Sequence, residues 1–118
     1  MKYALLIYSA SGTGPVAGSE EAQVEYSEYF AFGDYVRERA EIAAGEALHG
    51  VETATTVRVR DGEVLTTDGP FAETKELLGG FYIVEAQDLD QAIEFAGRIP
   101  TARYGSVEVR PVMEFEDM

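Results

Sequence analysis

The sequence contains no cysteine and only one histidine, His49. The absence of cysteine excludes a disulfide framework and thiol chemistry, and it is typical of a cytosolic protein. A single histidine among scattered carboxylates does not give the ligand spacing that zinc requires. The glycine-rich fingerprints of flavin, nicotinamide and phosphate-binding loops are missing as well. We therefore expect neither a metal nor a cofactor.

Basic side chains are also scarce, because 9 lysines and arginines stand against 22 aspartates and glutamates, for a net charge of −13. Such a surface repels phosphate backbones and anionic lipids, which excludes nucleic-acid binding and membrane binding. The negative charge has two interpretations. The general one is that it keeps the protein in solution, and the more specific one is that it attracts a basic protein partner.

Long hydrophobic runs are missing too. The N-terminal segment MKYALLIYSASG carries too short an apolar run for a signal peptide or a membrane helix. Together with the lack of cysteine, this predicts a cytoplasmic protein. The length of 118 residues predicts a single domain that spans residues 1–118.

The first half of the chain predicts a strand, a helix and a short extended segment. Residues 2–8 are apolar on both alternating sets, which is typical of a strand covered on both faces. Ser19 is a helix cap, and apolar residues at spacings of three and four predict a helix to about Ala43, ended by Gly45. Residues 46–50 are expected to be extended.

The second half opens with a hairpin. Residues 55–60 alternate, and Asp61-Gly62 is a strong two-residue turn signal. A two-residue loop pairs residue 60 with 63, 58 with 65, 57 with 66 and 55 with 68.

After the turn at 68–71, we expect one or two helical turns over 72–78, a hinge at Gly79-Gly80 and a strand over 81–86. A capping box at Asp88 and Gln91 begins a second helix that Pro100 closes, and a long alternating strand follows over 107–115.

This order, β-α-β-hairpin-β-α-β, predicts a ferredoxin-like α+β sandwich with two helices on one face of an antiparallel sheet. The other face would then be bare. Because the strands at 2–8 and 81–86 are apolar on both sides, we expect two copies to pack sheet against sheet as a homodimer.

The segment DGPFAETKE at 68–76 is a distinctive motif. With it, the sequence resembles the YCII-related family, in the branch known for its DGPF motif. The resemblance covers nearly the whole chain, through residues 2–8, 45–48, 53–82 and 98–115. It implies a dimeric α+β barrel built from two ferredoxin-like subunits. It also implies an association with extracytoplasmic-function sigma factors, or a lyase-like enzyme with a His–Asp pair. The wider family carries its histidine on the first helix, whereas residues 19–43 here contain none.

Asp68 and His49 are the candidate catalytic residues. An aspartate before glycine usually bonds to the backbone two residues on, but that residue is Pro70, which has no N–H. The carboxylate therefore either caps the turn through Phe71 or stays available to a ligand. His49 titrates near neutral pH and is either a general base or a surface residue.

Arg58, Arg110 and Tyr82 are the candidate substrate-binding residues. Each arginine lies on the polar alternation of a predicted strand, where it either holds an anionic group or forms a structural salt bridge. The hydroxyls of Tyr82 and Tyr104 are available to the cleft between the two packed sheets that these arginines would face. The aromatic side chains of the first helix are either core or a ligand-stacking surface.

Two functions remain open on these grounds. The first is a homodimeric small-molecule-binding protein, whose reaction, if it has one, is a cofactor-independent lyase or isomerase step near the dimer interface. The second is a non-enzymatic regulatory or interaction protein that meets an extracytoplasmic-function sigma factor.

Overall fold

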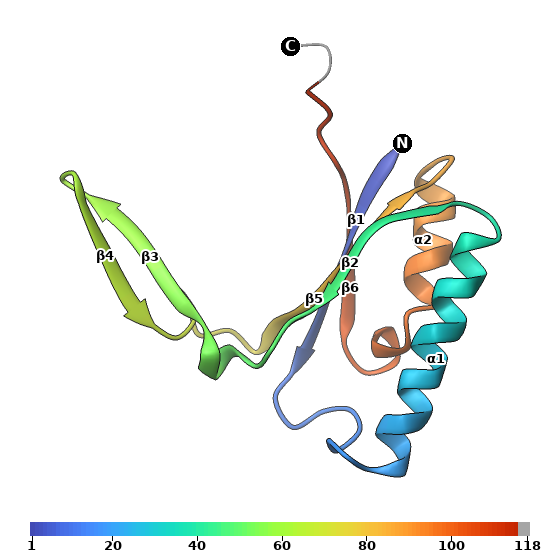
Figure 1. The fold of residues 1–118 in the computed structure, drawn as a ribbon, viewed down its shortest axis with the longest axis horizontal. Coiled ribbons are helices and arrows are strands. Elements are labelled where there is room, and N and C mark those ends of the chain that lie inside the picture. The colour runs from blue at the N-terminus through green and yellow to red at the C-terminus, as the bar shows by residue number, and fades with distance from the viewer. Residues whose placement is uncertain (116–118) are drawn as a thin grey trace.

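The body of the protein is a four-stranded antiparallel sheet with two helices on one face (Figure 1). The computed structural model describes residues 1–115, so the last three residues of the predicted domain, 116–118, lie outside the described residues. In sheet order, the strands are β2 (Glu41–Ala47), β5 (Glu76–Glu85), β1 (Lys2–Ala10) and β6 (Ser106–Pro111). The helices are α1 (Glu20–Arg37) and α2 (Leu89–Gly97). The predicted ferredoxin-like α+β fold is confirmed, with β1 and β5 at the centre of the sheet.

A separate hairpin projects from the body on the side away from the helices (Figure 1). We call it the arm; it consists of β3 (Thr55–Arg60) and β4 (Glu63–Asp68) and is inserted between β2 and β5. The predicted register is confirmed at all four pairs, 60 with 63, 58 with 65, 57 with 66 and 55 with 68. Asp61 and Gly62 both have positive φ, at 51° and 78°, as a two-residue hairpin turn requires.

The core lies between the helices and the face of the sheet that they cover. Leu5 of β1 and Val84 of β5 are fully buried there, against Val36 of α1 and Phe95 of α2. Because side chains alternate along a strand, Ala4, Leu6 and Tyr8 of β1 point to the opposite face. No helix of the described part of the chain covers that face (Figure 1).

Local capping explains where both helices begin. The Ser19 hydroxyl accepts a hydrogen bond from the Ala22 N–H at 3.1 Å. The Asp88 carboxylate accepts one from the Gln91 N–H at 2.9 Å, while the Gln91 side chain accepts from the Gln87 N–H at 2.8 Å. Both predicted caps are confirmed. In the capping box, the Gln91 side chain accepts from the N–H of Gln87, one residue before the Asp88 N–H that the motif predicts.

The predicted end of the first helix is wrong. α1 ends at Arg37, and residues 41–47 form the edge strand β2, in place of a continued helix and an extended segment at 46–50. Ala40 N–H bonds to the Val36 carbonyl and closes the helix. Pairing of β2 with β5 then overrides the helical preference of the alanines.

Two further boundaries differ from expectation. Residues 76–78 belong to β5 and not to a helical turn, because they pair with the end of β1, and residues 72–75 are irregular. The predicted hinge at Gly79-Gly80 lies inside β5, where the register with β1 shifts. The last strand, β6, ends at Pro111 and not at Phe115.

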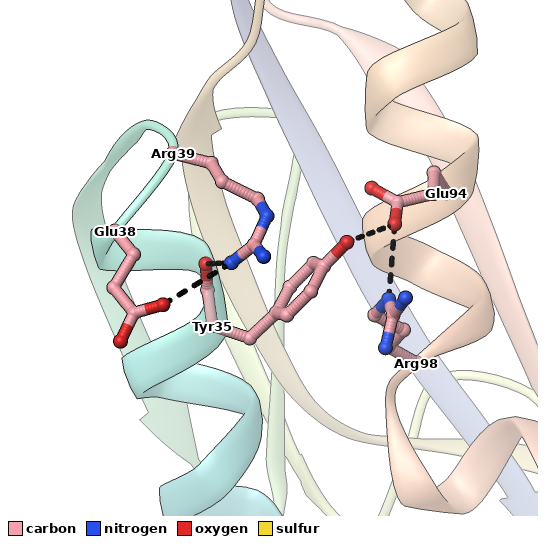
Figure 2. Close-up of polar contacts among 5 residues, drawn as sticks. All are labelled: Tyr35, Glu38, Arg39, Glu94 and Arg98. Carbon is pink, nitrogen blue, oxygen red and sulfur yellow. Dashed lines mark hydrogen bonds and ion pairs between the residues drawn. The ribbon is translucent and has the colours of Figure 1, made fainter.

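A cluster of charged side chains around Tyr35 joins the two helices (Figure 2). The guanidinium carbons of Arg39 and Arg98 lie 3.6 and 3.8 Å from the centre of the Tyr35 ring. The Tyr35 hydroxyl donates to Glu94 of α2, which also accepts from Arg98 Nε at 3.0 Å. These contacts fix α1 beside α2 and so hold α1 in place over the sheet.

Candidate functional site

A cleft of about 440 Å³ opens between α1 and the adjoining ends of three strands, and we call it the tyrosine cleft. Its volume lies in the range of small-molecule sites, roughly 300–1,000 Å³. Residues of α1, β1, β2, β5 and the turn after α2 line it: Ile7, Ser9, Tyr26, Tyr29, Gly45, Glu46, Ala47, Gly79, Gly80, Tyr82 and Thr101.

Glycines make the room for this cleft. A Cβ on Gly80 would lie 2.8 Å from the Glu46 carbonyl oxygen, so the close approach of β5 to β2 requires glycine there. A Cβ on Gly45 would lie 2.7 Å from the Tyr82 ring, which therefore lies directly over the β2 backbone. The Tyr82 ring also packs against Phe32 of α1, with centroids 5.0 Å apart. This packing fixes the orientation of Tyr82 in the cleft.

Two tyrosine hydroxyls are the polar groups of interest. The Tyr29 hydroxyl lies 2.6 Å from the hydroxyl of Thr101, which is only 7% exposed. Within residues 1–115, the Tyr82 hydroxyl makes no hydrogen bond. Burial raises the pKa of both Tyr29 and Tyr82 above the ordinary value of 10.0. Both phenols therefore stay protonated at neutral pH, and the Tyr82 hydroxyl is available to donate to a ligand.

A second hollow of about 240 Å³ lies beside the tyrosine cleft and shares Tyr26 and Tyr29 with it. Tyr104 closes it, and its hydroxyl donates to the Glu25 carboxylate at 2.9 Å. Burial is also the main cause of a raised pKa at Tyr104. The Tyr104 hydroxyl is thus already engaged within the chain, unlike that of Tyr82.

The lining gives the tyrosine cleft the character of a binding site for a partly apolar molecule. Its walls are aromatic and aliphatic side chains with bare glycine backbone, and its polar groups are hydroxyls together with one acidic residue, Glu46. Across the described part of the chain, no group of three or more His, Asp or Glu side chains is arranged to hold a metal ion. None of the helices there has the length and apolar character needed to cross a bilayer.

Of the predicted site residues, the structure brings only Tyr82 into the cleft. Asp68 is exposed at the end of β4, opposite Thr55, and in residues 1–115 its carboxylate accepts no hydrogen bond. Arg58 lies on β3 and donates to the Phe71 carbonyl at 3.4 Å. His49 is exposed between β2 and the short 3-10 helix at Val51–Thr53. These three residues thus lie on the arm or in the segment that leads to it.

Arg110 lies on β6 opposite Ala4, and it points away from the helices. Its Nε donates to Glu108 at 2.9 Å, and this bond is the main cause of the raised pKa of the arginine. Arg110 therefore forms a structural ion pair, which was one of its two predicted roles. The pair lies on the face of the sheet that the helices leave uncovered.

Sequence reasoning did not single out Tyr29, Ser9 or Thr101 as site residues. The aromatic side chains of α1 were the available signal, because they were recognised as either core or a ligand-contacting surface. Thr101 and Ser9 carried no signal, because only the folded chain brings the ends of β1 and α2 to the same place.

The comparisons with known proteins agree with this fold. A model of the YCII-related domain matches residues 1–116. An "Uncharacterized protein R00369" of Rhizobium meliloti (strain 1021) is 35% identical over 114 residues, which make up 95% of this chain and 92% of that protein.

Proposed function

Because the chain belongs to the YCII-related family, we propose that it is a small-molecule-binding protein that acts as a homodimer and holds its ligand in the tyrosine cleft. One observation carries this proposal: a cleft of about 440 Å³ in which a half-buried tyrosine hydroxyl, that of Tyr82, has no partner among the described residues. The hydroxyl of a partly buried tyrosine can donate a hydrogen bond, and a ligand oxygen in the cleft would accept it.

The arm supports the homodimer. Val57, Val59 and Val64 lie on one face of the arm and are 59%, 58% and 67% exposed. A two-stranded hairpin is marginally stable by itself, and within residues 1–115 this one has no third strand beside it. A second surface that covers the valines would supply the missing stabilisation.

The uncovered face of the sheet supports the homodimer as well. Leu6 pairs with Phe81 in the middle of this face, and Ile83 lies next to Phe81 along β5. All three are only partly buried in the single chain. The arm projects on this same side (Figure 1). A second copy packed there would cover the valines of the arm and the bare face of the sheet together, which is the arrangement of a dimeric α+β barrel.

The overall dimensions agree with a subunit shaped by a partner. The chain extends 49 × 47 × 18 Å, with a radius of gyration of 16.4 Å. A compact chain of this length has a radius of gyration of about 13.5 Å. The difference arises because the arm stands away from the body (Figure 1).

A reaction at the dimer interface would be a cofactor-independent lyase or isomerase step that uses Asp68 and either His49 or Arg58, and these residues lie outside the tyrosine cleft. Support comes from their position, since all three lie on or beside the arm that a second copy would meet. The Asp68 carboxylate, with no hydrogen bond from its own loop in residues 1–115, keeps its oxygens available.

A second candidate function is a non-enzymatic interaction protein, and the exposed valines of the arm favour it. In that proposal, the arm binds a protein partner such as a sigma factor and no second copy. The two functions differ in what they require: only the first needs the cleft to bind a ligand.

Ligand binding in the cleft is tested by a thermal-shift screen of small acids, amides and alcohols, because binding to the folded state raises the melting temperature. Ala47→Phe places a large ring in the cleft, and Ala31→Phe is the matched control on the exposed side of α1. We expect hits that Ala47→Phe abolishes and Ala31→Phe retains. Hits that survive Ala47→Phe unchanged would contradict the cleft as the binding site.

A further inference from the structure

Arg37 lies at the end of a stripe that leads into the tyrosine cleft. Tyr26, Tyr29, Gly33 and Arg37 follow one another along α1 at spacings of three and four, and therefore share one side of the helix. Tyr26 and Tyr29 line the cleft. Helical side chains lean toward the N-terminus of their helix, so Arg37 is directed toward these tyrosines.

The absence of a side chain at position 33 determines where the guanidinium lies. Arg37 Nη1 is 2.8 Å from the point that a Cβ on Gly33 would occupy. The guanidinium therefore lies over Gly33, one helical turn from Tyr29, which lines the cleft. Any residue with a Cβ at position 33 would displace it.

Arg37, like Arg58 and Arg60, has no acidic partner within residues 1–115. Four other arginines, at positions 39, 98, 103 and 110, each form an ion pair with a glutamate. In residues 1–115, no hydrogen bond or ion pair within the chain uses Arg37. Its five N–H donors are thus free for a ligand.

Tyr82 brings a second donor close to Arg37. The positive charge of Arg37 acts on the Tyr82 hydroxyl and partly offsets the rise in its pKa that burial causes. Tyr82 packs against Phe32, the residue before Gly33. The guanidinium over Gly33 and the Tyr82 ring against Phe32 thus contact neighbouring residues of α1, and both groups can donate hydrogen bonds.

We propose that the tyrosine cleft selects a small monocarboxylate with an apolar or aromatic body, whose carboxylate binds Arg37 and the Tyr82 hydroxyl. This inference rests on the proposed function. A carboxylate matches the planar fork of a guanidinium. Its single negative charge matches the one arginine, whereas a more highly charged ligand would be repelled by Glu46 in the lining of the cleft and by Glu25 in the adjoining hollow. The apolar body fits between Tyr26, Tyr29 and the glycine backbone.

The probes that test this inference are phenylacetate and its neutral isostere phenylacetamide. Binding is followed by NMR shifts of the Gly45, Gly79 and Gly80 amides, which report on the cleft in the folded protein. Arg37→Gln removes the charge, and Arg60→Gln at the tip of the arm is the matched control. We expect phenylacetate to bind the wild type and Arg60→Gln alike, and Arg37→Gln about ten-fold or more weakly.

The outcomes separate this inference from the proposed function. Equal binding of the acid and the amide, or binding of the acid that Arg37→Gln leaves unchanged, overturns carboxylate selection while the cleft remains a binding site. No shift of the glycine amides with phenylacetate also overturns the inference. In this experiment, ligand binding in the cleft, and with it the proposed function, fails when the neutral compounds of the screen leave these amides unmoved as well. Gly33→Ala provides an independent check, because it displaces the guanidinium without removing its charge and is expected to weaken phenylacetate binding.

Discussion

The hydroxyls of Tyr29 and Thr101 lie 2.6 Å apart and join the middle of α1 to the turn that follows α2. The pair forms one wall of the tyrosine cleft, and Thr101 is buried. The bond therefore links the shape of the cleft to the stability of the fold.

Tyr29→Phe is expected to lower the free energy of unfolding by about 1–2 kcal/mol, because it leaves the buried Thr101 hydroxyl without its partner. Urea denaturation measures the change. Thr101→Val in the same background is the control, since it removes the orphaned hydroxyl. The double variant is then expected to be no less stable than Tyr29→Phe alone, and a strictly additive loss would contradict the proposed coupling.

Glu28→Gln is expected to destabilise the protein at neutral pH but not in acid. Two hydrogen bonds from Arg103, at 2.7 and 2.8 Å, hold the pKa of Glu28 below its ordinary value of 4.5. A lowered pKa in the folded state contributes stability that is fully present above pH 4.5 and is lost as the pH falls through the folded-state pKa. Melting temperatures of wild type and variant should therefore converge below pH 4.5.

The control for this pH dependence is Glu73→Gln, at an exposed glutamate with no ion pair in the described residues. The difference in melting temperature between Glu73→Gln and the wild type should stay small and should not change with pH. Glu94 also has a lowered pKa, mainly through its bond from Tyr35, so it contributes to the acid sensitivity of both proteins equally. A Glu28→Gln difference that persists in acid would show that the side chain acts through packing and not through its charge.

Replacing the three valines of the arm with serine, in Val57→Ser/Val59→Ser/Val64→Ser, is expected to change the mass in solution. The wild type should sediment at twice the chain mass of 12.9 kDa and the variant at that mass itself. Val16→Ser/Val24→Ser is the control, because these valines are 75% and 59% exposed outside the arm. A wild type that sediments as a single chain would contradict the homodimer and favour the interaction protein.

Gly105→Ala is expected to cost about 1–3 kcal/mol of stability. A Cβ at this position would lie 2.1 Å from the Tyr8 carbonyl oxygen, which belongs to the backbone of β1 and cannot move freely. Gly97→Ala is the matched control, since its Cβ would meet nothing within 4 Å. Thermal unfolding of the two variants compares them directly. If Gly105→Ala and Gly97→Ala unfold at the same temperature, then β1 and the turn before β6 can move apart without a loss of stability.

The sequence was sufficient to predict the fold wherever local chemistry and the final structure agree. Asp61-Gly62 determines the register of the arm, and Ser19 and Asp88 determine where the helices begin. The order of elements then leads to the ferredoxin-like sheet.

Predictions failed where pairing over a long distance in the chain outweighs local preference. The alanines before Gly45 favour a helix, but Ile42 and Gly45 pair with β5. Residues 76–78 appear helical in isolation and become a strand because β1 extends to Ala10 beside them. The cleft could not be predicted for a related reason: Thr101 and Tyr29 meet only after both helices pack on the sheet.

Both ends of the arm arise from neighbouring strands of the main sheet. Leu48 N–H bonds to the Gly79 carbonyl at 2.9 Å, so the chain leaves the sheet and returns to it at one point. A turn of about two to five residues could bridge that gap. We therefore expect loss, lengthening or exchange of the hairpin to leave the helix–sheet body and the tyrosine cleft intact. Evolution can alter what the protein assembles with independently of what it binds.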